Sequence, residues 1–358
     1  MSGLDIKIPC KQEIFIMNMY SWMEQIIHTE KKKPLPILTF PAVQYILRTV
    51  REVMKDPNHL AIGMRLIADK YDMPASFGYM DLSAEAEAFG AYAAYPADEI
   101  PTIIGKLIED EAAADKLQVP AIGAVRTGIY LETINKALML IHDRPVFAQC
   151  IGPYSLAGRL MNVSDIMLQC YESPEVVHKV LRKVTDFLRM YALEFKKIGA
   201  HGIVLAEPLA GLLSPELMKE FSMEYVREIV DAVQDKHFLV IYHNCGSAVS
   251  KLIDEITDTG CFAYHFGESV DMKEILEKLP RNYLVMGNIS AAKVFNSNST
   301  DHVRIETLKL LRKCAKYNNF VLSSGCDIPP NVDLDNIDTF FQTSEDFYYR
   351  QMLRNIIS

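Results

Sequence analysis

Residues 173–208 read SPEVVHKVLRKVTDFLRMYALEFKKIGAHGIVLAEP, and this stretch decides the fold. Ser173 and Pro174 form a helix start signal, after which apolar side chains recur at helical spacing. Gly199 ends the helix, and the run GIVLA at 202–206 follows with no polar side chain. Because such a run can be buried on both faces, it predicts a strand of a parallel sheet that helices cover.

The same alternation of apolar runs and helical stretches continues along the chain. We expect eight strands, at 36–40, 76–80, 145–151, 202–206, 238–242, 261–266, 283–286 and 320–322. Eight strands that alternate with helices predict an α/β fold of the (β/α)8 TIM barrel type. A doubly wound open sheet is the alternative fold, because it is built from the same alternation.

The chain is longer than a plain barrel, which needs about 250 residues, because it has 358. We assign the surplus to a helical N-terminal extension at 1–34, with an amphipathic helix at 12–28, and to a helical insert between strands two and three, at 85–144. No linker rich in Gly, Ser or Pro and no internal repeat interrupts the pattern. The sequence therefore predicts one barrel domain, 1–358.

The composition excludes several classes of protein. Hydrophobic residues make up 49% and charged residues 23%, which is the balance of a globular chain. The formal charge of −9 disfavours a nucleic-acid binder, and no run of about 20 uncharged apolar residues indicates a membrane span. The seven cysteines are odd in number and unevenly spaced, so we expect no disulfide framework. With no signal-peptide pattern at the start, this predicts a cytoplasmic protein.

Polar side chains gather at the carboxyl ends of the predicted strands, where barrel enzymes carry their active sites. They are Glu207, His243, Cys245, His265, Glu268, Asn288 and Cys326. Because these strand ends meet at one mouth, separation along the chain is no obstacle to contact. Glu85 and Glu87, after the second strand, fit either a binding loop or a solvated helix start. The glycine patterns that bind phosphate and the GxSxG pattern of a nucleophilic serine are absent.

His243, Cys245 and Cys326 form a candidate zinc site. One imidazole nitrogen and two thiolates suit zinc, and three protein ligands with an open fourth position are typical of a catalytic zinc. The spacing by itself is weak evidence, because a buried cysteine is most often an inert apolar side chain. The expected position at the barrel mouth is what favours zinc over packing.

The fourth ligand stays open between Glu207, Glu268 and His265. Glu207 is also a candidate catalytic base, although a carboxylate that accepts hydrogen bonds from loop amides would fit the same pattern. We expect either His265 or Glu268 to orient a neighbour rather than bind the metal. Asn288 is the second candidate catalytic residue, as a substrate contact, although Asn after Gly is also common in turns.

Four stretches of the chain resemble the uroporphyrinogen decarboxylase superfamily in the order of its last five barrel strands. They are GIVLAEP, FLVIYHNCG, LVMGNIS and SSGCDIPPNVDLDNI. The decarboxylase branch carries an arginine-rich MRQAGR segment after the first strand and a Gly-His-Gly after the last. This chain has LTFPA at 38–42 and GCD at 325–327, so it lacks the arginines that would hold a substrate with many carboxylates.

The His-x-Cys…Cys set and the segment SAEAEA at 83–88 instead resemble the methylcobalamin:coenzyme M methyltransferase branch. This resemblance implies zinc held by His243, Cys245 and Cys326. Cobalamin-independent methionine synthase, a more distant barrel, has a similar site in which a glutamate follows the sixth strand. The comparison with that site keeps Glu268 among the candidates for the fourth ligand.

The resemblance also implies a function. It predicts a zinc-dependent methyltransferase that moves a methyl group from a methyl-corrinoid to a zinc-activated thiol such as coenzyme M. The donor would be methylcobalamin or a corrinoid carrier protein, and relatives in this superfamily often form homodimers. The alternatives are a decarboxylase of the uroporphyrinogen type and a non-catalytic barrel that binds a tetrapyrrole or corrinoid.

Overall fold

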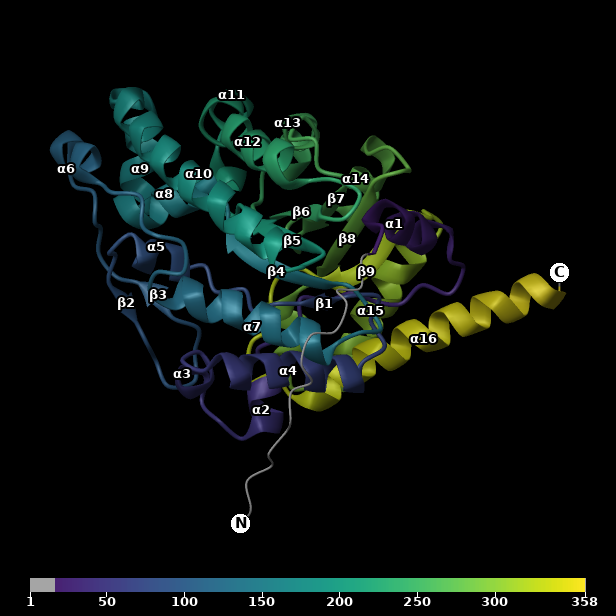
Figure 1. The fold of residues 1–358 in the computed structure, drawn as a ribbon. Coiled ribbons are helices and arrows are strands. Elements are labelled where there is room, and N and C mark those ends of the chain that lie inside the picture. The colour runs from purple at the N-terminus through teal and green to yellow at the C-terminus, as the bar shows by residue number, and fades with distance from the viewer. Residues whose placement is uncertain (1–16, 358) are drawn as a thin grey trace, which may run out of the picture.

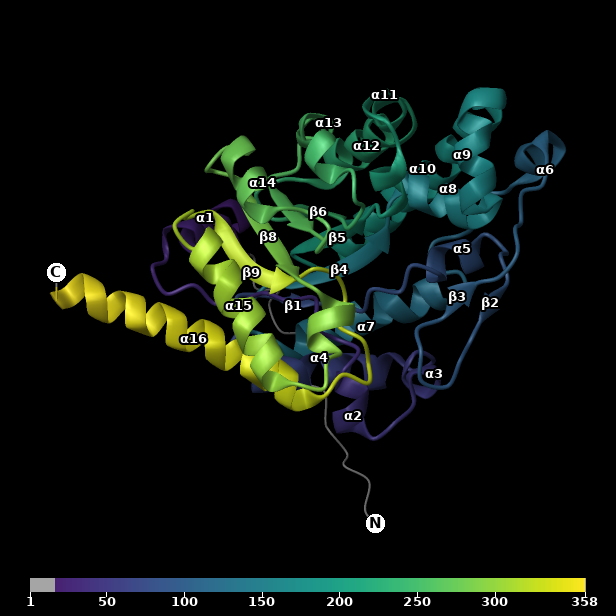
Figure 2. The same ribbon diagram turned by 180° about the vertical axis from the view of Figure 1, so that it is seen from behind.

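A curled parallel sheet forms the centre of the computed structural model, which describes residues 17–357 (Figures 1 and 2). In sheet order its seven strands are β1 (Ser76–Phe77), β4 (Val146–Ile151), β5 (Gly202–Ala206), β6 (Leu239–Asn244), β7 (Ala263–Phe266), β8 (Leu284–Ile289) and β9 (Phe320–Ser324). All neighbours are parallel, and their order follows the chain without a reversal. A doubly wound sheet reverses its order at one point, so that alternative is wrong.

Helices cover the outside of the sheet, as the unbroken apolar strands require. They are α1 (Met19–His28), α2 (Ala42–Ile46), α3 (Val50–Val53), α4 (Pro57–Lys70), α5 (Ala84–Ala88), α6 (Glu111–Lys116), α7 (Arg126–Leu140), α8 (Pro153–Met161), α9 (Val163–Glu172), α10 (Pro174–Lys197), α11 (Pro215–Met218), α12 (Glu224–Val233), α13 (Ile253–Thr257), α14 (Met272–Lys278), α15 (Thr300–Cys314) and α16 (Leu334–Ile357). Short 3-10 turns, η1 (Leu209–Leu212) and η3 (Val249–Lys251), and π-turns, η2 (Lys219–Met223) and η4 (Ala291–Phe295), follow several strands.

The segment predicted as the first strand, 36–40, is not a strand, although it lies between the two edges of the sheet. Leu35 N donates to Leu322 O of β9 at 2.9 Å, and Thr39 Oγ1 donates to Gly78 O, just after β1, at 2.9 Å. Pro34 and Pro36 have no N–H group to donate to a neighbouring strand, so a regular ladder cannot form here. The prediction of eight strands is therefore wrong by one, and an extended segment occupies the missing position.

Helix α1 starts later than the predicted helix at 12–28. The side chain of Asn18 accepts hydrogen bonds from the backbone N–H groups of Tyr20 and Ser21, which caps the helix at Met19. The predicted part at 12–16, like Cys10 and the rest of the first 16 residues, lies outside the described residues.

Helix α1 packs against the amino ends of the strands, the end opposite to the candidate site. Met19 N donates to Lys236 O at 2.7 Å, and the indole nitrogen of Trp22 donates to Pro74 O at 3.0 Å. Lys236 and Pro74 precede β6 and β1, respectively. The extension therefore covers one end of the sheet and leaves the carboxyl ends of the strands to the site.

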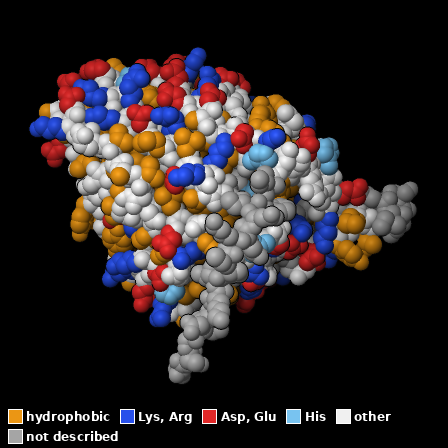
Figure 3. Space-filling model, in the orientation of Figure 1, with side chains coloured by type: hydrophobic (Ala, Val, Ile, Leu, Met, Phe, Trp, Pro, Cys, Tyr) orange, Lys and Arg blue, Asp and Glu red, His pale blue; other side chains and the backbone are white. Residues whose placement is uncertain are grey.

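The region predicted as a helical insert, 85–144, contains α6, α7 and most of α5, together with a small antiparallel sheet. That sheet pairs β2 (Ala93–Ala94) with β3 (Thr102–Ile103). Within residues 17–357, no helix combines the length and apolar character that crossing a bilayer requires. Acidic and basic side chains are intermixed over the face in Figure 3.

Gly202, at the start of β5, offers a test of how tightly the sheet is packed. A Cβ atom there would lie 2.1 Å from Leu239 O and 2.5 Å from Cε1 of Phe147. We predict that Gly202→Ala lowers the free energy of unfolding by about 2–4 kcal/mol, because β5 and β6 would have to separate. Urea unfolding followed by circular dichroism measures this loss.

The matched control is Gly105→Ala. A Cβ at Gly105 would meet nothing within 4 Å, but its φ of +74° costs an alanine about 1–2 kcal/mol. An equal loss in both variants would contradict the packing argument.

Candidate metal centre

Three side chains that are far apart in the sequence meet at the carboxyl ends of β6 and β9. The ligand atoms of His243, Cys245 and Cys326 all lie within 4.8 Å of one another. His243 is the second-last residue of β6, and Cys245 directly follows that strand. Cys326 lies two residues beyond β9. The imidazole is buried and both thiols are partly exposed, so the group is open on one side.

A chain of hydrogen bonds fixes which nitrogen of His243 faces the thiols. Ser323 Oγ donates its one proton to Leu35 O at 2.7 Å, so it must accept at its 2.8 Å contact with Nε2 of His265. Burial, and then His243 itself, lower the pKa of His265 well below its usual value, so His265 is neutral. Its Nδ1 therefore accepts from Nδ1 of His243 at 2.8 Å.

The relay engages Nδ1 of His243 and leaves its Nε2 facing the thiols. This nitrogen lies 4.0 Å from Sγ of Cys326. A metal-binding histidine needs this arrangement, in which the other ring nitrogen donates to a fixed partner. Both nitrogens of His265 are used in the chain, so the expectation of His265 as a fourth ligand does not fit this geometry.

The two thiols interact directly. A hydrogen bond from Cys326 lowers the pKa of Cys245, while the same bond and then burial raise the pKa of Cys326 to about 12. Cys245 is therefore the thiol of the pair that ionises more readily.

Two glycines allow the loops to approach this closely. A Cβ at Gly267 would lie 2.4 Å from Cβ of Cys245, and a Cβ at Gly325 would lie 2.7 Å from Oε2 of Glu268. The same Cβ at Gly325 would lie 2.8 Å from the backbone N of Glu268, so neither clash could be relieved by a side-chain rotation alone. Glycine is therefore required at both positions for the centre to form.

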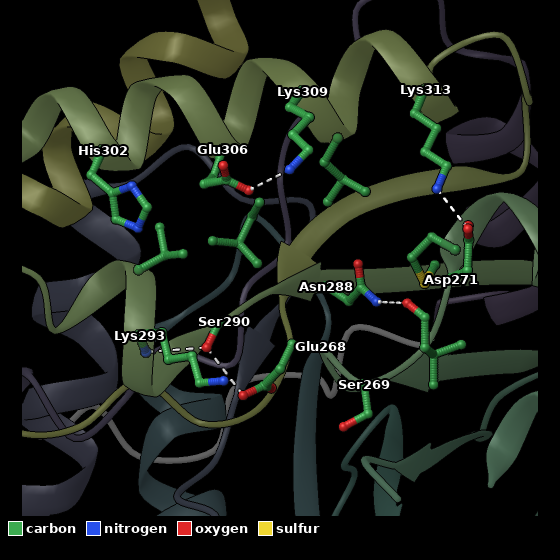
Figure 4. Close-up of a pocket in the computed structure, with 15 residues that line it drawn as sticks. Glu268, Ser269, Asp271, Asn288, Ser290, Lys293, His302, Glu306, Lys309 and Lys313 are labelled. Atoms are coloured by element: carbon green, nitrogen blue, oxygen red, sulfur yellow. Dashed lines mark hydrogen bonds and ion pairs between the residues drawn. The ribbon is translucent and has the colours of Figure 1, made fainter. Parts of the chain in front are cut away.

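Glu268 is the carboxylate that lies beside the thiols. Its side chain is exposed, and its Oε1 accepts a hydrogen bond from Ser290 Oγ at 3.1 Å. Its negative charge raises the pKa of Cys245 and so opposes the lowering caused by Cys326. Figure 4 shows Glu268 and Ser290 at the edge of a groove of about 530 Å³ between the ends of β7 and β8 and helix α15. Like Glu207 and His265, Glu268 is not among the three residues whose ligand atoms meet, but its carboxylate is exposed at the edge of the groove.

The carboxylate of Glu207 is used elsewhere. It is fully buried and accepts from Ser155 N at 3.1 Å and from Ser222 Oγ at 3.2 Å. A Cβ at Gly152 would lie 2.2 Å from its Oε1, and burial raises its pKa to about 8. Glu207 therefore links α8 to η2 through hydrogen bonds. It is not among the residues whose ligand atoms lie close enough together to hold one metal ion.

The amide of Asn288 holds the loop that carries Glu268. Its Nδ2 donates to Gly267 O at 2.9 Å and to Val270 O at 2.7 Å (Figure 4). Because both bonds fix the β7–α14 loop, the structure gives Asn288 a positioning role. Its carbonyl oxygen faces the groove in Figure 4.

Sequence reasoning did not find a buried ionic cluster on the β1 side of the mouth. The guanidinium of Arg126 pairs with Asp81, bonds Glu87 at 2.7 Å and donates to Ser83 Oγ at 2.9 Å. Tyr130 also donates to Asp81 at 2.8 Å. The segment at 83–88 was the only signal of this cluster, because an arginine inside a helical pattern normally indicates a solvated face.

Comparison with known proteins agrees with the geometry. A model of the uroporphyrinogen decarboxylase (URO-D) family matches residues 42–347. The chain belongs to the uroporphyrinogen decarboxylase family. It is 22% identical to uroporphyrinogen decarboxylase of Francisella tularensis over 78% of this chain and 82% of the relative. It is 24% identical to methylcobamide:CoM methyltransferase MtbA of Methanosarcina acetivorans over 93% of this chain and 100% of the relative.

Two solved structures share the fold. A methyltransferase from Methanosarcina mazei matches with a TM-score of 0.80 and 19% identity, over 93% of this chain and 99% of its own. A B12-independent methionine synthase from Shewanella matches with a TM-score of 0.55 and 14% identity, over 83% and 89%. The predicted membership of the superfamily, with likeness to its methyltransferase branch, is confirmed.

We predict that Ser323→Ala weakens zinc binding about 10- to 100-fold, because His265 would lose the partner that fixes its protons and, through it, those of His243. Competition with a chromophoric chelator measures the affinity. Ser324→Ala is the matched control, because Ser324 is equally buried but accepts from Ile37 N at 3.0 Å. Equal losses in both variants would show that the relay has no special role.

Glu85 gives a pH prediction. Its Oε1 accepts from Ile151 N at 3.1 Å, its Oε2 is buried without a partner, and burial raises its pKa to about 8. Between pH 4.5, its ordinary pKa, and pH 8, the folded chain keeps a proton that the unfolded chain loses, so stability falls as pH rises.

We predict that Glu85→Gln makes this fall shallower by up to about 1.4 kcal/mol per pH unit, because the amide does not ionise. Urea unfolding at pH 5, 6, 7 and 8 gives the two slopes. Parallel curves for the parent and the variant would mean that Glu85 is ionised in the folded protein.

Proposed function

We propose that the protein is a methyltransferase that moves a methyl group from a methyl-corrinoid to a thiol, with zinc held by His243, Cys245 and Cys326. The observation that carries the proposal is the meeting of one imidazole nitrogen and two thiol sulfurs within 4.8 Å at the carboxyl ends of the strands. The similarity to a methylcobamide:CoM methyltransferase over 93% of this chain supports the same reaction class.

The residues present fit zinc. Sulfur ligands around a tetrahedral zinc, at bonds of about 2.3 Å, are about 3.8 Å apart. The observed spread of 4.8 Å or less needs only small side-chain rotations to reach this. His243 offers Nε2 as a lone pair, and the thiols suit a borderline-soft cation.

Three protein ligands leave one side of the centre for a substrate. Zinc, when bound, acts as a Lewis acid that keeps a thiol ionised and nucleophilic at neutral pH. Glu268, which is exposed and held by Ser290, is the side chain placed to occupy the fourth side when the thiol is absent.

The reaction needs positioning more than acid–base catalysis. The sulfur of the acceptor attacks the methyl carbon, the S–C bond forms, and the Co–C bond breaks with its electron pair left on cobalt. The proton of the thiol goes to solvent. The role of the chain is to hold sulfur and methyl group in line, which accounts for a centre built on rigid strand ends with hydrogen-bonded supports.

The donor we propose is a corrinoid carried by a separate protein or free methylcobalamin, and the acceptor is a small thiol such as coenzyme M. Decarboxylation of a porphyrinogen is less well supported, because 38–42 offers no arginine to hold a substrate with many carboxylates.

Metal analysis and a methyl-transfer assay test the proposal together. We predict about one zinc per chain in the parent, and a methyl transfer from methylcobalamin to a thiol that Cys326→Ala slows by at least about 100-fold. The spectrum of the corrinoid follows the reaction. Cys261→Ala is the matched control, because Cys261 is a buried packing residue before β7 and should keep both zinc and rate.

Two results would contradict the proposal. One is a purified parent without stoichiometric zinc. The other is a Cys326→Ala variant that transfers methyl groups as fast as Cys261→Ala. Release of carbon dioxide from a porphyrinogen by the parent would favour the decarboxylase, and tight corrinoid binding without turnover would favour a binding protein.

A further inference from the structure

Helix α8 places a single arginine at the mouth. The helix starts directly after Gly152 at the end of β4, and it packs against α5 and η1, which follow β1 and β5. It therefore lies over the carboxyl ends of the strands. Of its nine residues, eight are buried, and Arg159 is the one that reaches partly exposed space.

The guanidinium of Arg159 has no partner. Within residues 17–357, no hydrogen bond or ion pair engages its side chain, although burial is sufficient to lower its pKa. The negative charge of Asp81 raises the pKa of Arg159 and offsets part of the lowering caused by burial. The chain has therefore placed at the mouth a partly buried guanidinium that no anion of the described residues pairs with, and a ligand oxyanion there would form charge-assisted hydrogen bonds with it.

Asp81 is not available to Arg159, because its oxygens are already used. Oδ1 accepts from Ser83 N at 3.0 Å and from Ser83 Oγ at 2.6 Å. Oδ2 accepts from Tyr130 at 2.8 Å and pairs with Arg126. Arg126 thus shows how a buried arginine on this side of the mouth is satisfied, and Arg159 stands out as the unsatisfied one.

We propose that Arg159 binds an oxyanion of the substrate that enters the mouth. A guanidinium presents its N–H groups as a planar fork, which matches a sulfonate, carboxylate or phosphate with two oxygens side by side. The inference rests on the proposed function, since that function brings a substrate to this mouth. The oxyanion belongs either to the acid group of the thiol acceptor or to the phosphate of the corrinoid's nucleotide arm.

Paired substrates with and without the anion separate these two sources. We expect Arg159→Met to raise KM about 10- to 100-fold for the substrate that carries the recognised oxyanion and to leave the KM of the analogue without that oxyanion unchanged. The acceptor pair is 2-mercaptoethanesulfonate and 2-mercaptoethanol. The donor pair is methylcobalamin and methylcobinamide, which lacks the phosphate. Arg182→Met, on the exposed face of α10, is the matched control and should change none of the four values.

Binding at equilibrium gives a readout that does not depend on turnover. Cyanocobalamin and cyanocobinamide are titrated into the metal-free protein, and 2-mercaptoethanesulfonate is titrated into the cobalt(II)-substituted protein and followed by absorption. Arg159→Lys keeps the charge but loses the fork, so we expect a loss of affinity smaller than that of Arg159→Met. Circular dichroism checks that each variant folds.

Unchanged KM ratios and unchanged affinities in Arg159→Met would overturn the inference. Failure of the proposed function looks different, because the parent itself would then lack zinc or methyl transfer. In that case calorimetric titration of cyanocobalamin and of 2-mercaptoethanesulfonate into the metal-free protein still tests the inference, since an Arg159-dependent affinity for either anionic ligand supports the anion site and equal affinities refute it.

Discussion

The candidate centre depends on one hydrogen-bond relay, from the carbonyl of Leu35 through Ser323 and His265 to His243. Each bond determines the direction of the next, because the serine has one proton and the neutral imidazole has one donor and one acceptor. Through this relay the carbonyl of Leu35, just before the extended segment, determines that Nδ1 of His243 is engaged and that its Nε2 faces the two thiols.

The same relay explains why the extended segment at 36–40 matters although it forms no strand. Leu35 links it to β9 on one side, and Thr39 links it to the end of β1 on the other. The parallel sheet supplies the rest of the geometry, since it brings the carboxyl ends of its strands to one place. Glycines at 267 and 325 then let the loops approach within van der Waals contact of the ligands.

The sequence was sufficient to predict the alternation of strands and helices and the meeting of His243, Cys245 and Cys326, because strand ends must converge in such a sheet. It could not predict the direction of Glu207, which depends on a glycine at 152 and a serine in a π-turn. The predicted number of strands was too high by one, because Pro34 and Pro36 cannot donate the hydrogen bonds of a regular ladder at the segment 36–40. The sequence could not reveal the role of Ser323, which depends on contacts with Leu35 and His265 that are distant in the chain. It placed Arg159 near the mouth but could not show that its guanidinium has no partner among the described residues.

X-ray absorption spectroscopy at the zinc edge identifies the atoms that bind the metal. We predict two sulfur scatterers at about 2.3 Å and nitrogen or oxygen scatterers at about 2.0 Å in the purified protein. We also predict a third sulfur when a thiol substrate is added, at the expense of a light scatterer. A zinc shell without sulfur, or a protein that binds no zinc, would contradict the account.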